Sequence, residues 1–208
     1  MKKLNTKSLV ILGVLTAFVI IFSTTPIGSI PIGPLVITLN IIPIALAAIA
    51  LGPVGGVAIG AMFGLFSFLQ AAGVIQGTAF AQTLFSINPL ATFVQCVVPR
   101  VLDGLCVGLI YNAVAKFNKE TACFVTGFFS AFLNTVFFMT SLVLLYGNTE
   151  YLQDKIAGRN IIVFIIAFVG VNAITEMVSS TVISGAVGVA LQKAKLIDNN
   201  PNKTAQVS

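Results

Sequence analysis

The chain has 208 residues, of which 57% are hydrophobic and only 8% are charged. Soluble domains carry charges at about one residue in four, so this composition excludes an ordinary soluble protein and indicates an integral membrane protein. Apolar stretches are long and recur along the whole chain, unlike the short alternating segments of a membrane β-barrel. We therefore expect an all-α integral membrane protein.

Six apolar segments divide the chain, at about 20 residues for each membrane crossing. They predict helices over residues 8–25, 35–51, 54–72, 89–115, 121–146 and 161–192. Because long polar linkers are missing between them, we expect residues 1–208 to form one compact transmembrane bundle. The first segment follows a lysine cluster, as in a signal peptide, but lacks a small-residue cleavage site after it, so we expect it to be retained.

The positive charges predict the orientation of the bundle. With six crossings, Lys155 and Arg159 lie on one side of the membrane. The other side carries eight basic residues: Lys2, Lys3, Lys7, Lys116, Lys119, Lys193, Lys195 and Lys203. By the positive-inside rule, both termini are expected to be cytoplasmic. The sequence pI of about 9.3 then reflects membrane topology, so we expect no nucleic-acid partner.

The connection "TTPIGSIPIGPLV" at residues 24–36 is uncharged and contains three prolines and two glycines. Such a segment is stiff and non-helical. Two interpretations fit: a flap packed over the outer mouth of the protein, or a segment lying among the lipid headgroups. In the first interpretation the candidate gating residues are Pro26, Gly28, Pro31, Gly33 and Pro34.

Small residues recur at every fourth position in several segments. The longest series runs from Gly52 to Gly64, and such a stripe lets another helix backbone approach closely. Packing inside this chain explains that series most simply. A weaker pair, Gly13 and Ala17, lies on the first segment, where it serves either internal packing or a partner.

Polar residues at mid-depth are the strongest functional signal. At about 1.5 Å of rise per residue, Arg100, Asn134 and Glu176 each lie near the middle of a predicted helix. Asp103 lies one turn from Arg100, and Asn172 lies one turn from Glu176. A charge at that depth costs at least about 2.5 kcal/mol on insertion scales, so these groups must face a protein interior or a watery cavity.

Two interpretations of this group remain open. In the first, Arg100 forms a buried salt bridge with Asp103 or Glu176 that pins helices together. In the second, Arg100 binds a carboxylate or phosphate of a ligand while the amides select its hydrogen-bonding groups. Pro99 favours the second, because an interior proline bends the helix and leaves a carbonyl one turn earlier, near Gln95, without its donor.

An enzyme is not expected. The chain has no histidine, no metal-ligand cluster and no nucleophile with an adjacent base, so we predict neither catalytic residues nor a metal site. The three cysteines lie in apolar segments, where cysteine behaves as a small hydrophobe. The phosphate-binding pattern G-x-x-x-x-G-K-[ST] is also missing, so the chain is not expected to hydrolyse ATP itself or to hold a cofactor.

Two stretches carry a resemblance to a known family. "LNIIPIALAAIALGPVGGVAIGAMFG" at residues 39–64 and "INPLATFVQCVVPRVLDGL" at 87–105 resemble the substrate-binding S components of energy-coupling factor (ECF) vitamin transporters. The likeness covers residues 8–195, and "SINP" and "VVPR" look most like the pantothenate-specific members. It implies a high-affinity vitamin-binding subunit in a bacterial plasma membrane. Such a subunit docks on a transmembrane coupling subunit and two ABC ATPases, which use the ATP.

The resemblance also gives roles to residues. The family's small-residue docking pattern on the first helix falls here on Gly13 and Ala17. Pantothenate is a small carboxylate with hydroxyl and amide groups, which suits Arg100. The other candidate binding residues are Asn134, Gln95, Asn172, Glu176, Asp103 and Asn88. Two alternatives stay open: an S component for a folate, pyridoxine, hydroxymethylpyrimidine or riboflavin type of vitamin, and a stand-alone carrier in which Glu176 or Asp103 relays protons.

Overall fold

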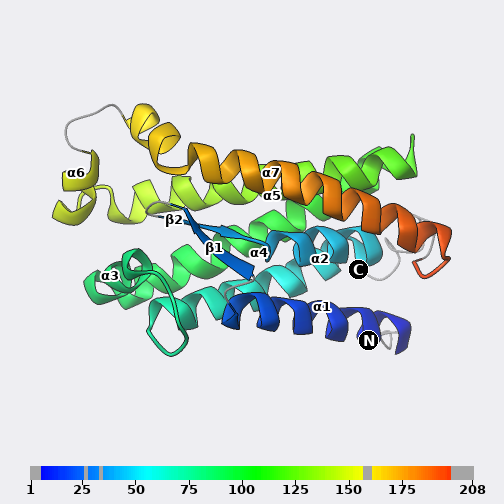
Figure 1. Ribbon diagram of the computed structural model, residues 1–208, viewed down its shortest axis with the longest axis horizontal. Helices are drawn as coiled ribbons and strands as arrows, with labels where there is room; N and C mark the ends of the chain where they lie inside the picture. Colours follow the sequence, from blue (N-terminus) through cyan, green and yellow to red (C-terminus); the bar gives the residue numbers. More distant parts are fainter. Residues whose placement is uncertain (1–5, 26–27, 33–34, 157–160, 198–208) are drawn as a thin grey trace.

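Long helices lie side by side along one axis in the computed structural model, which describes residues 6–25, 28–32, 35–156 and 161–197 (Figure 1). The elements are, in chain order, α1 (Thr6–Thr24), β1 (Ser29–Ile32), β2 (Leu35–Thr38), α2 (Ile41–Ala71), α3 (Ala79–Ile87), α4 (Pro89–Val114), α5 (Lys119–Tyr146), α6 (Glu150–Ile156) and α7 (Ile161–Lys193). The predicted helices at 8–25, 89–115, 121–146 and 161–192 are confirmed to within two residues at each end.

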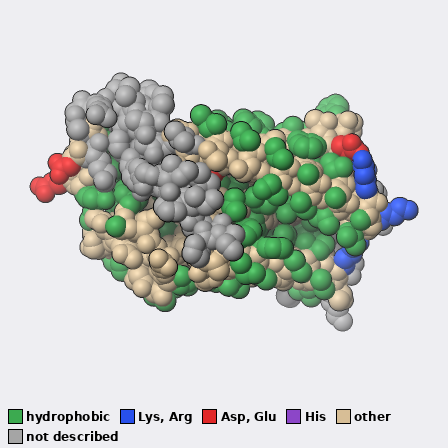
Figure 2. All heavy atoms as spheres, in the orientation of Figure 1, with side chains coloured by type: hydrophobic (Ala, Val, Ile, Leu, Met, Phe, Trp, Pro, Cys, Tyr) green, Lys and Arg blue, Asp and Glu red, His purple; other side chains and the backbone are tan. Residues whose placement is uncertain are grey.

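Five of these helices are long and apolar enough to cross a membrane within the described residues: α1, α2, α4, α5 and the Asn172–Lys193 part of α7. Large hydrophobic side chains are exposed along all of them, and Figure 2 shows such side chains covering the middle of the molecule. An apolar surface of this extent is typical of contact with lipid. The chain is a multi-pass helical membrane protein.

The α2 helix consists of two pieces that meet at Gly52. This residue has φ 69° and ψ −157°, a conformation that glycine adopts readily because it has no Cβ. A Cβ built on Gly55 would lie 2.7 Å from the Ala47 carbonyl oxygen, although residues eight apart in one straight helix are separated by about 12 Å. The chain therefore doubles back at Gly52. The predicted break between residues 51 and 54 is at the correct position.

The start of the second predicted helix was wrong. Residues 35–38 form strand β2, which pairs antiparallel with β1 in a two-stranded hairpin, and α2 begins only at Ile41. The fold is therefore helical with one hairpin rather than purely α. β-Branched residues at positions 36–38 favour a strand. Apolar content alone does not separate a short strand from a helix, which explains the error.

Basic side chains gather at the end of the bundle where α1 begins and α7 ends. Lys7 Nζ donates a hydrogen bond to the Lys195 carbonyl oxygen at 3.3 Å, and Lys193 forms a salt bridge of 3.4 Å with Glu120 at the start of α5. Lys and Arg side chains are visible at this end in Figure 2. The described parts near both termini therefore lie at the same end of the molecule.

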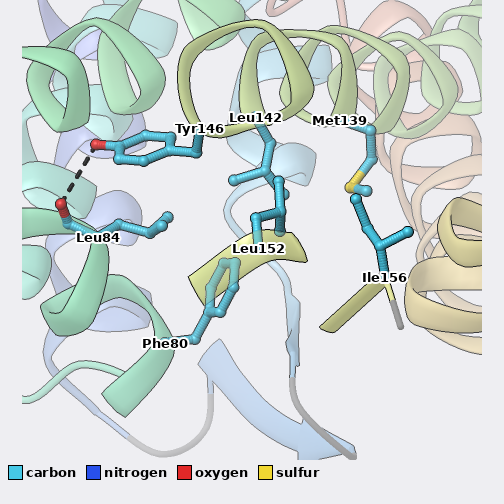
Figure 3. Close-up of a cluster of buried hydrophobic side chains, with 7 residues drawn as sticks. All are labelled: Phe80, Leu84, Met139, Leu142, Tyr146, Leu152 and Ile156. Carbon is cyan, nitrogen blue, oxygen red and sulfur yellow. Dashed lines mark hydrogen bonds between the residues drawn. The ribbon is translucent and has the colours of Figure 1, made fainter. Parts of the chain in front are cut away.

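Two short helices, α3 and α6, pack on α5 at the opposite end. They lie within segments 73–88 and 147–160, where no helix was predicted. Their contact is a buried apolar cluster around Tyr146 (Figure 3), made of Phe80, Leu84, Met139, Leu142, Tyr146, Leu152 and Ile156. The Tyr146 hydroxyl hydrogen-bonds to Thr92 Oγ1 at 2.6 Å and donates to the carbonyl oxygens of Asn88 and Leu84 at 3.1 and 3.4 Å.

The glycine series of α2 packs against α4. A Cβ on Gly56 would collide with the Gly104 carbonyl, and one on Gly60 would collide with the carbonyl of Arg100. A Cβ on Gly64 would also lie too close to the α4 backbone, at 2.8 Å from Val97 Cα. The expected internal packing of this series is confirmed. Side chains on this part of α4 are thereby held directly beside α2.

Candidate functional site

Arg100 lies in the buried part of α4, with 8% of its surface exposed. Its Nη1 donates a hydrogen bond of 2.8 Å to the carbonyl oxygen of Gln95. Pro99 has no N–H to donate to that carbonyl, which is the position four residues before it. The guanidinium therefore occupies the place of the missing backbone donor, at the carbonyl that Pro99 was predicted to leave without one.

Two aromatic rings flank the guanidinium. Arg100 Cζ lies 5.3 Å from the ring centre of Phe63 on α2 and 4.8 Å from that of Phe138 on α5. Both distances are within the range of a cation–π interaction. The positive charge is thus held by two rings and a carbonyl, and the Nε of the guanidinium has no hydrogen-bond partner among the described residues.

The two mid-depth carboxylates have other partners. Asp103 is fully buried and its Oδ2 accepts a hydrogen bond from Ser130 Oγ at 3.2 Å. Glu176 Oε1 accepts one from the backbone N–H of Thr38 at 2.8 Å. Both carboxylates interact electrostatically with Arg100. Among the described residues, however, neither forms a salt bridge with it, so the structure does not contain the salt bridge of the first interpretation.

The amide side chains line the same region. Gln95 is buried and its Nε2 donates to the Phe138 carbonyl oxygen at 2.9 Å. Asn134 is buried one turn after Ser130 and one turn before Phe138, so it lies between the two points where α5 contacts α4. Asn172 is buried one turn before Glu176 on α7. Helices α4, α5 and α7 thus supply six of the seven predicted binding residues, and all six are buried.

Five buried polar atoms of this group have no hydrogen-bond partner among the described residues. They are Gln95 Oε1, Arg100 Nε, Asp103 Oδ1, Asn134 Oδ1 and Asn172 Nδ2. Buried polar atoms are normally paired, so a concentration of unpaired ones calls for an explanation. The set combines donors with acceptors, as expected where a small polar ligand completes the hydrogen bonding. We call these five residues with Glu176 the Arg100 group.

Asn88 is the seventh predicted binding residue, and the structure does not bring it into the Arg100 group. It is exposed at the start of α4, where its Oδ1 accepts a hydrogen bond from the Ala91 N–H at 3.0 Å. This is the geometry of a helix N-cap. Asparagine before proline is a common start of a helix, so the sequence "NP" at residues 88–89 is itself a signal for an N-cap.

Four contact groups of the site were not predicted. Ser130 was recognisable, because it lies one turn from Asn134 on the same face of its helix. The backbone of Thr38 depends on the unpredicted hairpin. Phe63 and Phe138 are two among 17 phenylalanines, and no feature of the sequence separates them from residues that face lipid or core.

The predicted gating segment ends beside this group. Through Thr38, strand β2 is hydrogen-bonded to Glu176 of α7. Gly28 is buried, and a Cβ there would collide with the Phe22 backbone; Pro31 lies in β1. The remaining candidates, Pro26, Gly33 and Pro34, fall outside the described residues. The hairpin thus connects the loop interpreted as a flap to a predicted binding residue.

The predicted docking residues Gly13 and Ala17 are exposed on α1. A Cβ added to Gly13 would meet no atom within 4 Å. The alternative in which both residues pack inside this chain is therefore wrong. Their face of α1 is open for contact with lipid or with another protein.

Comparison with known proteins places this arrangement in a family. Residues 7–187 match the family described as "ECF transporter, substrate-specific component". The chain is 26% identical over 205 residues to the pantothenic acid transporter PanT of Lactococcus lactis, covering 94% of this chain and 98% of that protein. It is 28% identical over 197 residues to the pantothenate transporter PanT of Leuconostoc mesenteroides, covering 88% and 91%. The chain therefore belongs to the substrate-specific components of ECF transporters, as its resemblance to their pantothenate members indicated.

Proposed function

We propose that this chain is the high-affinity pantothenate-binding subunit of an ATP-driven ECF importer in a bacterial plasma membrane. The observation that carries the proposal is the Arg100 group, with its unpaired donors and acceptors buried between α4, α5 and α7. The names of the two relatives, both described as transporters of this vitamin, support the choice of ligand. The energy for transport comes from partner subunits: a transmembrane coupling subunit and two ABC ATPases.

The chemistry of the Arg100 group suits the two ends of pantothenate. The carboxylate pairs with the guanidinium of Arg100, whose Nε is buried and unpaired. The hydroxyl and amide groups of the vitamin offer both donors and acceptors, which match the amides of Asn134, Asn172 and Gln95. A carboxylate ligand also offsets the burial of a cation that has no salt-bridge partner among the described side chains.

The proposed topology has six membrane-crossing segments with both termini in the cytoplasm. The first part of α2, residues 41–51, is only about 16 Å long, against a hydrocarbon core of about 30 Å. We assign the rest of that crossing to the β1–β2 hairpin. Lys7, Lys119, Lys193 and Lys195 lie at one end of the bundle, and the positive-inside rule makes that end cytoplasmic.

The hairpin then lies on the outer side, where it covers the bound vitamin. Its contact with Glu176 holds one strand against α7 beside the ligand. A cover of this kind excludes water and strengthens the polar contacts beneath it. Ligand should therefore slow amide hydrogen exchange at residues 28–40. Equal exchange with and without pantothenate would remove the hairpin from the mechanism.

A binding and uptake experiment tests the proposal. Purified protein in detergent is titrated with pantothenate and, separately, with folate, pyridoxine, hydroxymethylpyrimidine and riboflavin. We expect pantothenate alone to bind tightly, and liposomes to take it up only when the coupling subunit, both ATPases and ATP are present. Tight binding of a different vitamin would reassign the substrate. Uptake by the chain alone, driven by a pH gradient, would establish a proton-coupled carrier instead.

Docking is tested on the exposed face of α1. The double variant Gly13→Leu with Ala17→Leu blocks close helix approach there but touches no residue of the Arg100 group. We expect normal pantothenate binding by the isolated subunit and loss of ATP-driven uptake. Val178→Leu, on the exposed face of α7, is the control and should change neither property. Normal uptake by the double variant would exclude this face as the docking surface.

A further inference from the structure

Pro99 is the residue of α4 whose role the proposed function does not explain. It is buried and adjoins Arg100, yet it offers a ligand neither a donor nor an acceptor in its side chain. An interior proline removes one helix hydrogen bond and destabilises the helix. The carbonyl left without its backbone donor is that of Gln95, and this carbonyl accepts the 2.8 Å hydrogen bond from Arg100 Nη1.

We propose that Pro99 is a positioning residue for ligand recognition, which acts by reserving the Gln95 carbonyl for Arg100. The inference rests on the proposed function, because it concerns how Arg100 meets a carboxylate. In a helix with an N–H at position 99, that N–H would compete with the guanidinium for the same carbonyl. The arginine side chain would then lose the contact that fixes its direction.

The two aromatic rings complete the positioning. Arg100 Cζ lies over the rings of Phe63 and Phe138, at 5.3 and 4.8 Å from their centres, while the Gln95 carbonyl oxygen accepts a hydrogen bond from Nη1. Arginine binds a carboxylate best through two parallel N–H groups of one edge. With Nη1 occupied, the edge that carries the unpaired Nε is left for the ligand. Pro99, Phe63 and Phe138 therefore determine which edge of Arg100 faces the carboxylate.

The test compares pantothenate with its alcohol analogue, in which CH₂OH replaces the carboxylate. Both compounds fill the site, but only the acid uses the charge of Arg100. We expect Pro99→Ala to weaken binding of the acid about tenfold, the size of one lost charge-assisted hydrogen bond, and to change binding of the alcohol less than about twofold. Pro89→Ala, in the first turn of the same helix and exposed, is the matched control and should leave both affinities unchanged.

The aromatic pair gives a second, independent variant. Phe138→Leu keeps the backbone carbonyl that accepts from Gln95 but removes one ring from the guanidinium. We expect this variant to weaken binding of the acid by about threefold to tenfold, and to weaken binding of the alcohol less. Phe132→Leu, on the exposed face of the same helix, is its control.

The outcomes separate this inference from the proposed function. If the unaltered protein binds pantothenate but Pro99→Ala and Phe138→Leu weaken acid and alcohol equally, both residues act only through packing and the inference is wrong. Unchanged binding of the acid in both variants overturns it in the same way. If the unaltered protein fails to bind pantothenate, the proposed function itself is wrong.

Discussion

Two buried polar regions lie next to each other along α4 and differ in how completely they are hydrogen-bonded. Thr92 and Tyr146 bond each other at 2.6 Å, and the Tyr146 hydroxyl also reaches two backbone carbonyls. Neither residue has an unpaired buried polar atom in the described structure. One turn further along α4 the Arg100 group begins, and five of its atoms are unpaired.

This difference indicates that buried polar side chains can serve two different purposes in one helix. A polar network that the protein itself completes fixes how helices pack, and the Tyr146 network joins α3, α4 and α5 in this way. A network left incomplete costs stability unless something else completes it. The same helix therefore contains a completed polar contact near its start and the proposed recognition site near its middle. Four substitutions test this division.

The largest effect is expected from Arg100→Ala. It removes the cation that is flanked by two rings and lacks a salt-bridge partner among the described residues. Pantothenate binding should weaken by about 2–5 kcal/mol, measured by titration calorimetry. Arg100→Lys keeps the charge but loses the planar fork, so it should recover only part of the loss. Arg100→Ala that folds normally and binds pantothenate with unchanged affinity would refute the site.

Asn134→Ala is expected to weaken binding by about 1–3 kcal/mol, since it deletes an amide proposed to bond the ligand. Asn112→Ala is a demanding control, because Asn112 Oδ1 is also buried and unpaired but lies more than three helical turns from Arg100 on α4. We expect binding by that variant to be unchanged. Equal losses in both variants would mean that an unpaired amide does not by itself mark the site.

Asn88→Ala should leave pantothenate affinity unchanged and lower the free energy of unfolding by about 0.5–2 kcal/mol, through loss of the α4 N-cap. Thermal unfolding in detergent and calorimetric titration measure the two quantities. Asn88→Ser keeps a capping oxygen and should restore most of the stability. Weaker pantothenate binding by Asn88→Ala would mean that Asn88 belongs to the binding site. The two polar regions of α4 would then not be separate in function.

Tyr146→Phe is expected to have the smallest effect. It removes one hydroxyl from a completed network, so stability should fall by about 0.5–1.5 kcal/mol while pantothenate binding stays the same. A shift in the midpoint of thermal unfolding without a shift in affinity would support a purely structural role. If the substitution instead impairs binding as strongly as Asn134→Ala, the two networks function as one.

Hydropathy predicted most of the helices because the bilayer fixes their length, and Arg100, Asn134 and Glu176 lie near the middle of their helices, as predicted. The covalent chemistry of Pro99 was sufficient to identify the Gln95 carbonyl as a free acceptor. The partners of Asp103 and Glu176 were not predictable, because they depend on how helices distant in sequence align. Ser130 and Thr38 come into contact only once α5 and the hairpin are placed.

The hairpin was missed for a different reason. In a membrane protein, a short strand and a helix that faces lipid can be equally apolar, so hydropathy does not separate them. The short helices α3 and α6 were missed because their segments are broken by polar residues and are too short to carry a clear period. Asn88 lies in the "SINP" stretch that carries the family resemblance, and a resemblance in sequence does not separate a binding residue from a helix cap.

The hydrogen bond between Thr38 and Glu176 also has a consequence for the synthesis of the chain. It joins residues 138 positions apart, so its acceptor is made only when α7 emerges from the ribosome. A strand cannot satisfy its own backbone groups as a helix does, and lipid offers them no partners. We therefore expect strand β2 to reach its final place late in biogenesis, once α7 has been made.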